Sequence, residues 1–176
     1  LRGHALDGLF RYGTDRERAD ARTLLERLVR DAGDDWVERG LAAKTLVECG
    51  GPAERRTLRR WAGDGGLAGG ARYRAAEALA DGGGPADLAS ALRAFAELLD
   101  DPLADPVVRH FAARDMYRHG GAAERADLER RAQDRSADPR ARVVAAAGVM
   151  QSREGAAARL AAGILASLAA DPDLDA

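Results

Sequence analysis

Four arginines and a tryptophan on one short segment are the side chains in this sequence best placed for chemistry. Arg55, Arg56, Arg59 and Arg60 form two pairs with a spacing of four residues, and Trp61 follows directly. Residues four apart lie on the same face of a helix, so each pair would present two guanidinium groups together. Because arginine and tryptophan are enriched among the residues that dominate interface energetics, we predict a partner-binding patch here. The alternative is an ordinary solvated helix face.

Residues suited to catalysis or metal binding form no recognisable pattern. His4, His110 and His119 belong to separate segments and include no pair four residues apart, the spacing that a zinc site on a helix uses. Cys49, the single cysteine, precedes a glycine pair and is expected to be a packed side chain rather than a reactive thiol. The sequence also lacks the sequence motifs of serine hydrolases and of phosphate-binding loops. We therefore expect no catalytic residues, no metal, no cofactor and no enzymatic activity.

The composition limits both the fold and the partners. Of 176 residues, 40 are alanine, while valine and isoleucine together supply nine, which favours helices over strands. The formal net charge of −2 argues against nucleic acid as a partner, although it leaves a local basic patch open. No apolar run reaches the length of a membrane span, so we expect no membrane contact. A lone cysteine fits a reducing compartment, and the expected location is cytoplasmic.

A repeated motif organises the whole chain. It consists of an arginine, small or apolar residues at +3 and +4, a larger apolar residue at +7 and a glycine at +11. Five copies begin at Arg2, Arg39, Arg72, Arg109 and Arg142, and the last has Arg153 in place of the glycine. The offsets 0, +3, +4 and +7 mark one face of a helix. Each copy therefore predicts a helix of about three turns, ended by a glycine in the left-handed conformation.

The residues around the motif predict where helices begin. Asp35, Asp105 and Asp138 lie four residues before the motif arginine, where an aspartate caps a helix, whereas Ala68 makes the corresponding start weaker. A second helix is expected after each glycine, near 15–31, 53–63, 86–100, 123–134 and 156–170. No strand is predicted.

The motif arginines share the inward stripe with the small residues, so their guanidinium groups need an acceptor close by. The aspartate one turn earlier can supply it. A ladder of arginines for phosphate or carboxylate ligands is the competing interpretation. We favour structural ion pairs between Arg39 and Asp35, Arg109 and Asp105, and Arg142 and Asp138.

Helix pairs of this size cannot bury their apolar faces alone, so neighbouring pairs must stack. The sequence predicts one all-α domain over residues 1–176, an α-solenoid of about four and a half antiparallel helix pairs. Its units are approximately 1–33, 34–67, 68–103, 104–136 and 137–176. The phrase from Asp105-Pro106 through Arg109 to Met116 resembles HEAT repeats, and in particular the short bacterial variety. The departures from that pattern are Ala68 and Arg153.

The resemblance implies a solenoid but little chemistry, since HEAT-like proteins range from scaffolds to a few enzymes. We expect a non-enzymatic module that binds a protein or peptide on its concave face, as a regulatory or sensor part of a larger bacterial protein. The alternatives are a nucleic-acid-binding or DNA-glycosylase-type HEAT-like protein and a structural spacer. Leu1 begins inside a repeat and Asp171-Pro172 stands where another would start, so we expect a fragment of a longer protein.

Overall fold

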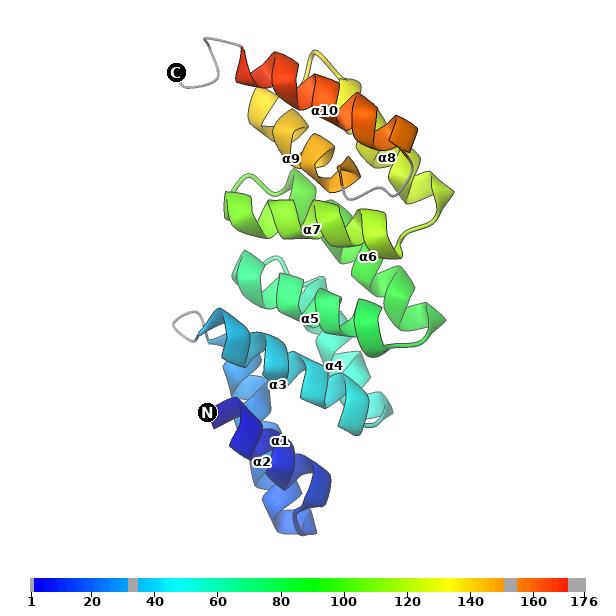
Figure 1. The fold of residues 1–176 in the computed structure, drawn as a ribbon. Coiled ribbons are helices and arrows are strands. Elements are labelled where there is room, and N and C mark those ends of the chain that lie inside the picture. The colour runs from blue at the N-terminus through cyan, green and yellow to red at the C-terminus, as the bar shows by residue number, and fades with distance from the viewer. Residues whose placement is uncertain (1, 32–34, 151–154, 171–176) are drawn as a thin grey trace. The chain divides into compact units, whose positions relative to one another are not determined.

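The computed structural model describes residues 2–31, 35–150 and 155–170, and within these ranges it is built from helices without a strand (Figure 1). Arg153, Asp171-Pro172 and the predicted boundary at 33/34 lie outside the described residues. The helices are α1 (Arg2–Tyr12), α2 (Asp15–Arg30), α3 (Trp36–Cys49), α4 (Pro52–Ala62), α5 (Gly69–Gly82), α6 (Pro85–Asp100), α7 (Pro106–His119), α8 (Ala122–Gln133), α9 (Pro139–Val149) and α10 (Gly155–Ala169).

The helix starts follow the sequence prediction. Asp35, Asp105 and Asp138 each accept a hydrogen bond from the backbone N–H two residues on, at 2.7, 2.7 and 3.0 Å. This side-chain cap satisfies one of the amides that the first turn of a helix leaves without a partner. Ala68 provides no such bond before α5, as predicted. The second helices of the five pairs begin and end within one residue of the expected ranges.

The turn glycines correct the prediction of a left-handed conformation. Gly50, Gly83 and Gly120 are extended, with φ of −81°, −89° and −74°, and no described glycine has positive φ. Glycine is required at these turns because there is no room for a Cβ. A Cβ on Gly83 would lie 2.4 Å from the carbonyl oxygen of Leu79 and 2.4 Å from the Cβ of Asp87. The chain turns so tightly between the two helices of a pair that a side chain cannot fit.

An acidic residue closes the turn from the other side. The backbone N–H that follows the turn glycine donates to a carboxylate three residues on, at the first turn of the second helix. These bonds join Thr14 to Glu17 at 2.8 Å, Gly51 to Glu54 at 2.7 Å, Gly84 to Asp87 at 3.0 Å and Gly121 to Glu124 at 2.8 Å. The same short turn thus recurs in four helix pairs.

The contacts between helices divide the chain into two compact units. The first ends at Ala94, and the second begins at Phe95. This boundary falls inside α6 rather than between two of the predicted repeats. In the first unit α3 packs on α1, α2, α4 and α5; in the second, α9 packs on α7, α8 and α10.

The motif positions form the cores of both units. Fully buried or nearly so are Ala42, Ala43 and Leu46 on α3, Ala75, Ala76 and Leu79 on α5, Ala112, Ala113 and Met116 on α7, and Ala145, Ala146 and Val149 on α9. In α1, by contrast, the matching Ala5 and Leu9 are exposed. The small residues let neighbouring first helices approach closely. At Gly148 the helices α7 and α9 approach closely, because a Cβ there would lie 2.9 Å from the backbone of Ala113.

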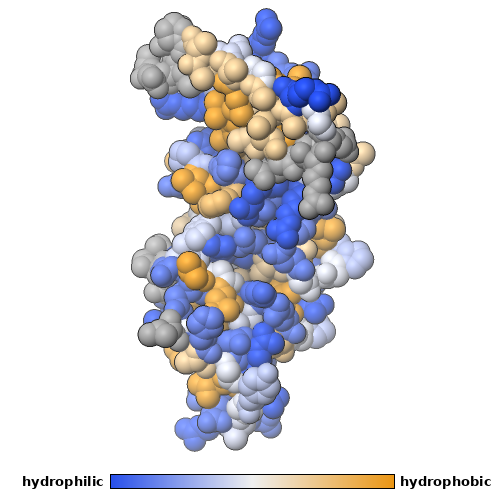
Figure 2. All heavy atoms as spheres, in the orientation of Figure 1, coloured by the Kyte–Doolittle hydropathy of each residue, from blue (hydrophilic) through white to orange (hydrophobic). Residues whose placement is uncertain are grey.

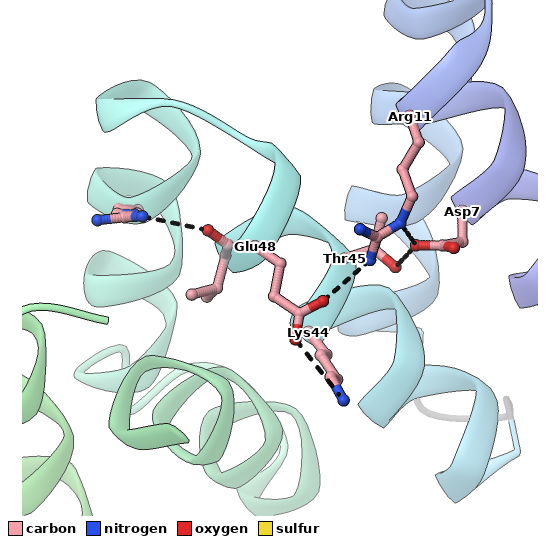
Figure 3. A network of polar contacts seen from close by, with 7 residues as sticks. Asp7, Arg11, Lys44, Thr45 and Glu48 are labelled. Atoms are coloured by element: carbon pink, nitrogen blue, oxygen red, sulfur yellow. Dashed lines mark hydrogen bonds and ion pairs between the residues drawn. The ribbon is translucent and has the colours of Figure 1, made fainter. Parts of the chain in front are cut away.

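A polar network joins α1 to α3 in the first unit (Figure 3). The carboxylate of Asp7 accepts from the hydroxyl of the fully buried Thr45 at 2.7 Å and from Nε of Arg11 at 2.8 Å. Arg11 also reaches Glu48 at 2.9 Å, and Glu48 in turn pairs with Lys44 at 3.6 Å. Burial raises the pKa of Asp7, but the bonds from Thr45 and Arg11 outweigh it and hold the pKa below the ordinary value of 3.8.

Substitution of Gly148 tests the close approach of α7 and α9. Gly148→Ala should lower the free energy of unfolding by about 1–3 kcal/mol, because the added methyl group meets the backbone of Ala113. The matched control is Gly163→Ala on α10, where a Cβ meets nothing within 4 Å. That variant should gain up to about 1 kcal/mol from helix propensity. Urea unfolding followed by circular dichroism measures both, and equal shifts in the two variants would contradict the packing.

Acid titration tests the Asp7 network. A lowered carboxyl pKa stabilises the folded state above the ordinary value of 3.8, and this contribution is lost as the pH falls through the lowered one. Thr45→Val should therefore cost about 1 kcal/mol at neutral pH, a difference that shrinks below the ordinary pKa. Thr23→Val is the control, because the exposed Thr23 bonds only within its own helix. A Thr45→Val effect that is the same at every pH would show that Asp7 plays no part.

Candidate functional site

The predicted patch lies on α4, and the structure separates its two arginine pairs. Arg55 and Arg59 are half-buried and point toward α6, whereas Arg56 and Arg60 are exposed. This separation follows from the spacing, since residues four apart share a face and the two pairs are offset by one residue.

Asp87 receives the inward pair. Its side chain is buried, and Arg59 Nη1 lies 3.1 Å from one carboxylate oxygen, with Arg55 Nη1 at 3.9 Å from the other. Asp87 also caps the first turn of α6 through Gly84, so one carboxylate serves both contacts. Arg55 adds a long hydrogen bond of 3.5 Å to the carbonyl of Val47, near the end of α3. The inward arginines therefore hold α4 against its neighbours.

The same arrangement occurs one helix pair earlier. Arg22 on α2 contacts the buried carboxylate of Glu54 at 2.9 Å, and Glu54 caps the first turn of α4. Sequence reasoning missed these contacts between second helices. The available signal was a fixed offset, because an arginine follows the capping acid by five residues both in α2, after Glu17, and in α4, after Glu54.

Trp61 belongs to the core and not to the exposed patch, which corrects its assignment as a surface contact. Its side chain is only 4% exposed, and the guanidinium of Arg30 lies over the ring at 5.4 Å from the centroid. The position explains the burial: Trp61 lies three residues beyond the fully buried Leu58, so both share the inward face of α4.

Arg39, Arg72, Arg109 and Arg142 are buried or half-buried as predicted, whereas Arg2 is exposed. The bonds that the structure shows for these arginines differ from the expected ones. Arg39 is buried and donates to the backbone carbonyl of Asp31, and Arg142 donates to the carbonyl of Ala132 at 3.3 Å. Both acceptors lie at the end of the preceding second helix. The carboxylates of Asp35, Asp105 and Asp138 are engaged by the helix amides. Within the described residues Arg109 makes no ion pair with Asp105, because that carboxylate accepts the amide of Val107 instead. The ion pairs of Arg39 with Asp35 and of Arg142 with Asp138 stay a prediction.

The exposed face of α4 carries two positively charged side chains, Arg56 and Arg60. Within the part of the chain that the structure describes, Arg56 and Arg60 make no hydrogen bond or ion pair. The acidic residue of α4, Glu54, is buried and occupied by Arg22. Two guanidinium groups thus lie side by side on a helix that Arg55 and Arg59 hold in place.

Two aromatic residues of the first unit form an internal stack. Trp36 and Tyr73 stack with centroids 5.4 Å apart, and the Arg74 guanidinium lies 3.9 Å from the Trp36 centroid. Gly40 leaves room for this arginine, since a Cβ there would lie 3.1 Å from Arg74 Cζ. The stack joins α3 to α5 instead of forming an open aromatic surface.

The described ranges contain no cluster of three or more histidine, cysteine or acidic side chains that could hold a metal ion. Over the same ranges, no helix combines the length and the apolar character that crossing a membrane requires. Cys49 is half-buried, and burial raises the pKa of its thiol. A raised pKa leaves less of the reactive thiolate.

Comparison of the chain with family models, with curated proteins and with solved structures finds no match. The exposed arginine pair, Arg56 and Arg60, is consequently interpreted from geometry and charge alone.

Substitution of Asp87 tests whether it holds the inward arginines. Asp87→Asn keeps an acceptor for Gly84 but removes the charge, so it should destabilise the chain by about 1–3 kcal/mol. Asp20→Asn is the matched control, since Asp20 is an exposed aspartate on α2. Urea unfolding measures both free energies. An Asp87→Asn variant as stable as the control would show that the pairs with Arg55 and Arg59 contribute nothing.

Proposed function

We propose that this chain is a HEAT-like helical-repeat module without enzymatic activity, which binds an acidic protein or peptide segment over α4. The proposal extends to an α-solenoid arrangement of the helix pairs and to a regulatory or sensor role within a larger bacterial protein in the cytoplasm.

The recurring turn supports the repeat interpretation. Four helix pairs use the same tight glycine turn and the same capping acid, and first helices pack on first helices within each unit. Equal helix pairs that stack in this way provide an extended surface for a partner.

One observation carries the binding proposal. Arg56 and Arg60 are exposed, and their side chains have no partner in the described chain. The residues directly before them, Arg55 and Arg59, contact Asp87. A guanidinium presents planar donors that match a carboxylate in a two-bond geometry. Because α4 is already held in place, little conformational freedom of the backbone is lost on binding.

The character of the surface favours charge over apolar recognition in the first unit. In Figure 2 the face over α1, α3 and α5 is mainly hydrophilic, with small separate hydrophobic patches. A partner that fits Arg56 and Arg60 on α4 brings acidic groups at about the spacing of one helix turn. Charge pairing of this kind contributes mainly to the association rate and to specificity.

Fluorescence anisotropy with a labelled hexaglutamate peptide tests the proposal. The double variant Arg56→Gln/Arg60→Gln should weaken binding about 5-fold, as expected for two exposed ion pairs. The matched control is Arg16→Gln/Arg27→Gln, which removes two exposed arginines from α2. The control should bind within about 2-fold of the unchanged chain. Equal losses in the two double variants would show unspecific attraction and contradict the proposal.

Single-stranded DNA of similar charge is titrated in parallel over a salt series. The proposal predicts that the peptide binds more tightly than the DNA at physiological salt. A tighter complex with DNA whose affinity falls steeply with salt would instead favour the nucleic-acid-binding alternative. Failure of both probes to bind would favour a structural spacer.

A further inference from the structure

A cavity in the second unit has an unusual lining. It has a volume of about 360 Å3 and lies between the end of α6, the first turns of α7, the end of α8 and the start of α9. Its lining combines apolar residues, among them Leu99 and Val144, with charged residues that include Arg109. The volume lies at the lower end of the range for ligand pockets.

Arg109 differs from Arg39 and Arg142 in its side-chain bonds. Arg39 and Arg142 donate to carbonyls at the end of the preceding helix, but the side chain of Arg109 makes no hydrogen bond or ion pair in the described chain. A buried Nε without a partner is common to Arg39, Arg72 and Arg109, so what sets Arg109 apart is that its terminal nitrogens, too, have no acceptor among the described residues. A half-buried guanidinium without an acceptor costs free energy, and such groups call for an explanation. A ligand in the cavity would supply an acceptor for the terminal nitrogens.

The other charged groups at the cavity are already occupied. Arg131 donates to the Asp100 carboxylate through both of its terminal nitrogens, and its Nε lies 2.7 Å from an Asp127 carboxylate oxygen. Arg130 pairs with Asp127 as well. The Asp134 carboxylate accepts from the hydroxyl and the amide of Ser136, at 2.6 and 3.0 Å, and these bonds lower its pKa. The Asp134 carboxylate in the lining therefore stays negatively charged.

The charge balance selects the class of ligand. Arg130 and Arg131 are neutralised by Asp100 and Asp127, which leaves Arg109 as the basic residue of the lining whose side chain makes no ion pair in the described chain. A single negative charge neutralises Arg109, whereas the second charge of a phosphate group would meet the carboxylates of Asp100 and Asp134 without compensation. The apolar residues of the lining suit a short hydrocarbon group next to the anion.

We propose that this cavity binds a monocarboxylate with a short apolar group, whose carboxylate accepts from Arg109 while the apolar group packs against Val144 and its neighbours. The ligand is either a free small carboxylic acid or the carboxyl terminus of a peptide chain, because both present the same chemistry. This site lies in the second unit, apart from α4, and does not depend on the function proposed for the arginine pair of the first unit.

Binding is measured on the full chain by NMR titration with N-acetyl-leucine, with the peptide N-acetyl-Ala-Ala-Leu and with the amide of each. Both acids should bind with dissociation constants of about 1 mM or below, and both amides should bind at least about 10-fold more weakly. A preference of 10-fold or more for the peptide identifies a chain terminus as the ligand, and otherwise the small acid suffices. Inorganic phosphate should not bind detectably.

Two variants place the ligand in the cavity. Arg109→Gln should weaken binding of the acids at least about 10-fold. Val144→Phe should do the same, because the larger side chain fills the cavity where the apolar group of the ligand would pack. The control is Arg140→Gln, an exposed arginine in the first turn of α9, which should bind as the unchanged chain does. Circular dichroism verifies that each variant is folded.

Three results would each overturn the proposal: amides that bind as well as acids, phosphate that binds more tightly than the acids, or no binding of either acid up to about 20 mM. Unchanged affinity in a folded Arg109→Gln variant would also overturn it. If that variant does not fold, the comparison of acids with amides and the Val144→Phe variant still decide the question. None of these outcomes bears on the acidic-peptide experiment with Arg56 and Arg60.

Discussion

The contact between each turn glycine and the acidic residue that opens the next helix sets the geometry of this protein. Gly50, Gly83 and Gly120 have no room for a Cβ, because the preceding helix carbonyl and the capping acid close on them from both sides. The acid in turn accepts the turn amide. The tight turn restricts how the second helix of a pair can leave the first, and the small residues at the motif positions then allow close packing of the first helices.

The capping acids also connect successive pairs in the first unit. Glu54 is reached by Arg22, and Asp87 by Arg59 and Arg55, so each of these buried carboxylates fastens its own helix and the one before it. The arginines of α4 accordingly divide into two pairs. Arg55 and Arg59 hold the helix through Asp87, and Arg56 and Arg60 are exposed, which is why we propose them as the contacts for a partner.

The parts of the fold that depend on local interactions could be predicted from the sequence. Asp35, Asp105 and Asp138 cap helices because the bond spans two residues, and the second helices follow from apolar spacing. The conformation of the turn glycines was predicted wrongly, since crowding by Glu54 or Asp87 imposes glycine as firmly as a left-handed φ does. The burial of Trp61 could have been predicted from its spacing of three residues from Leu58. The missing acceptor of Arg109 depends on which helices lie side by side, and no local pattern carries that information.

A double-mutant cycle between Arg22 and Glu54 tests the central claim most directly, because it isolates the contact that joins a capping acid to the preceding helix. The free energy of unfolding is measured in urea for Arg22→Gln, Glu54→Gln and the double variant. The account predicts that the two losses are not additive and that the coupling energy is about 1 kcal/mol. Additive losses would mean that the acids cap their own helices and nothing more, and would contradict the account of how the pairs are held together.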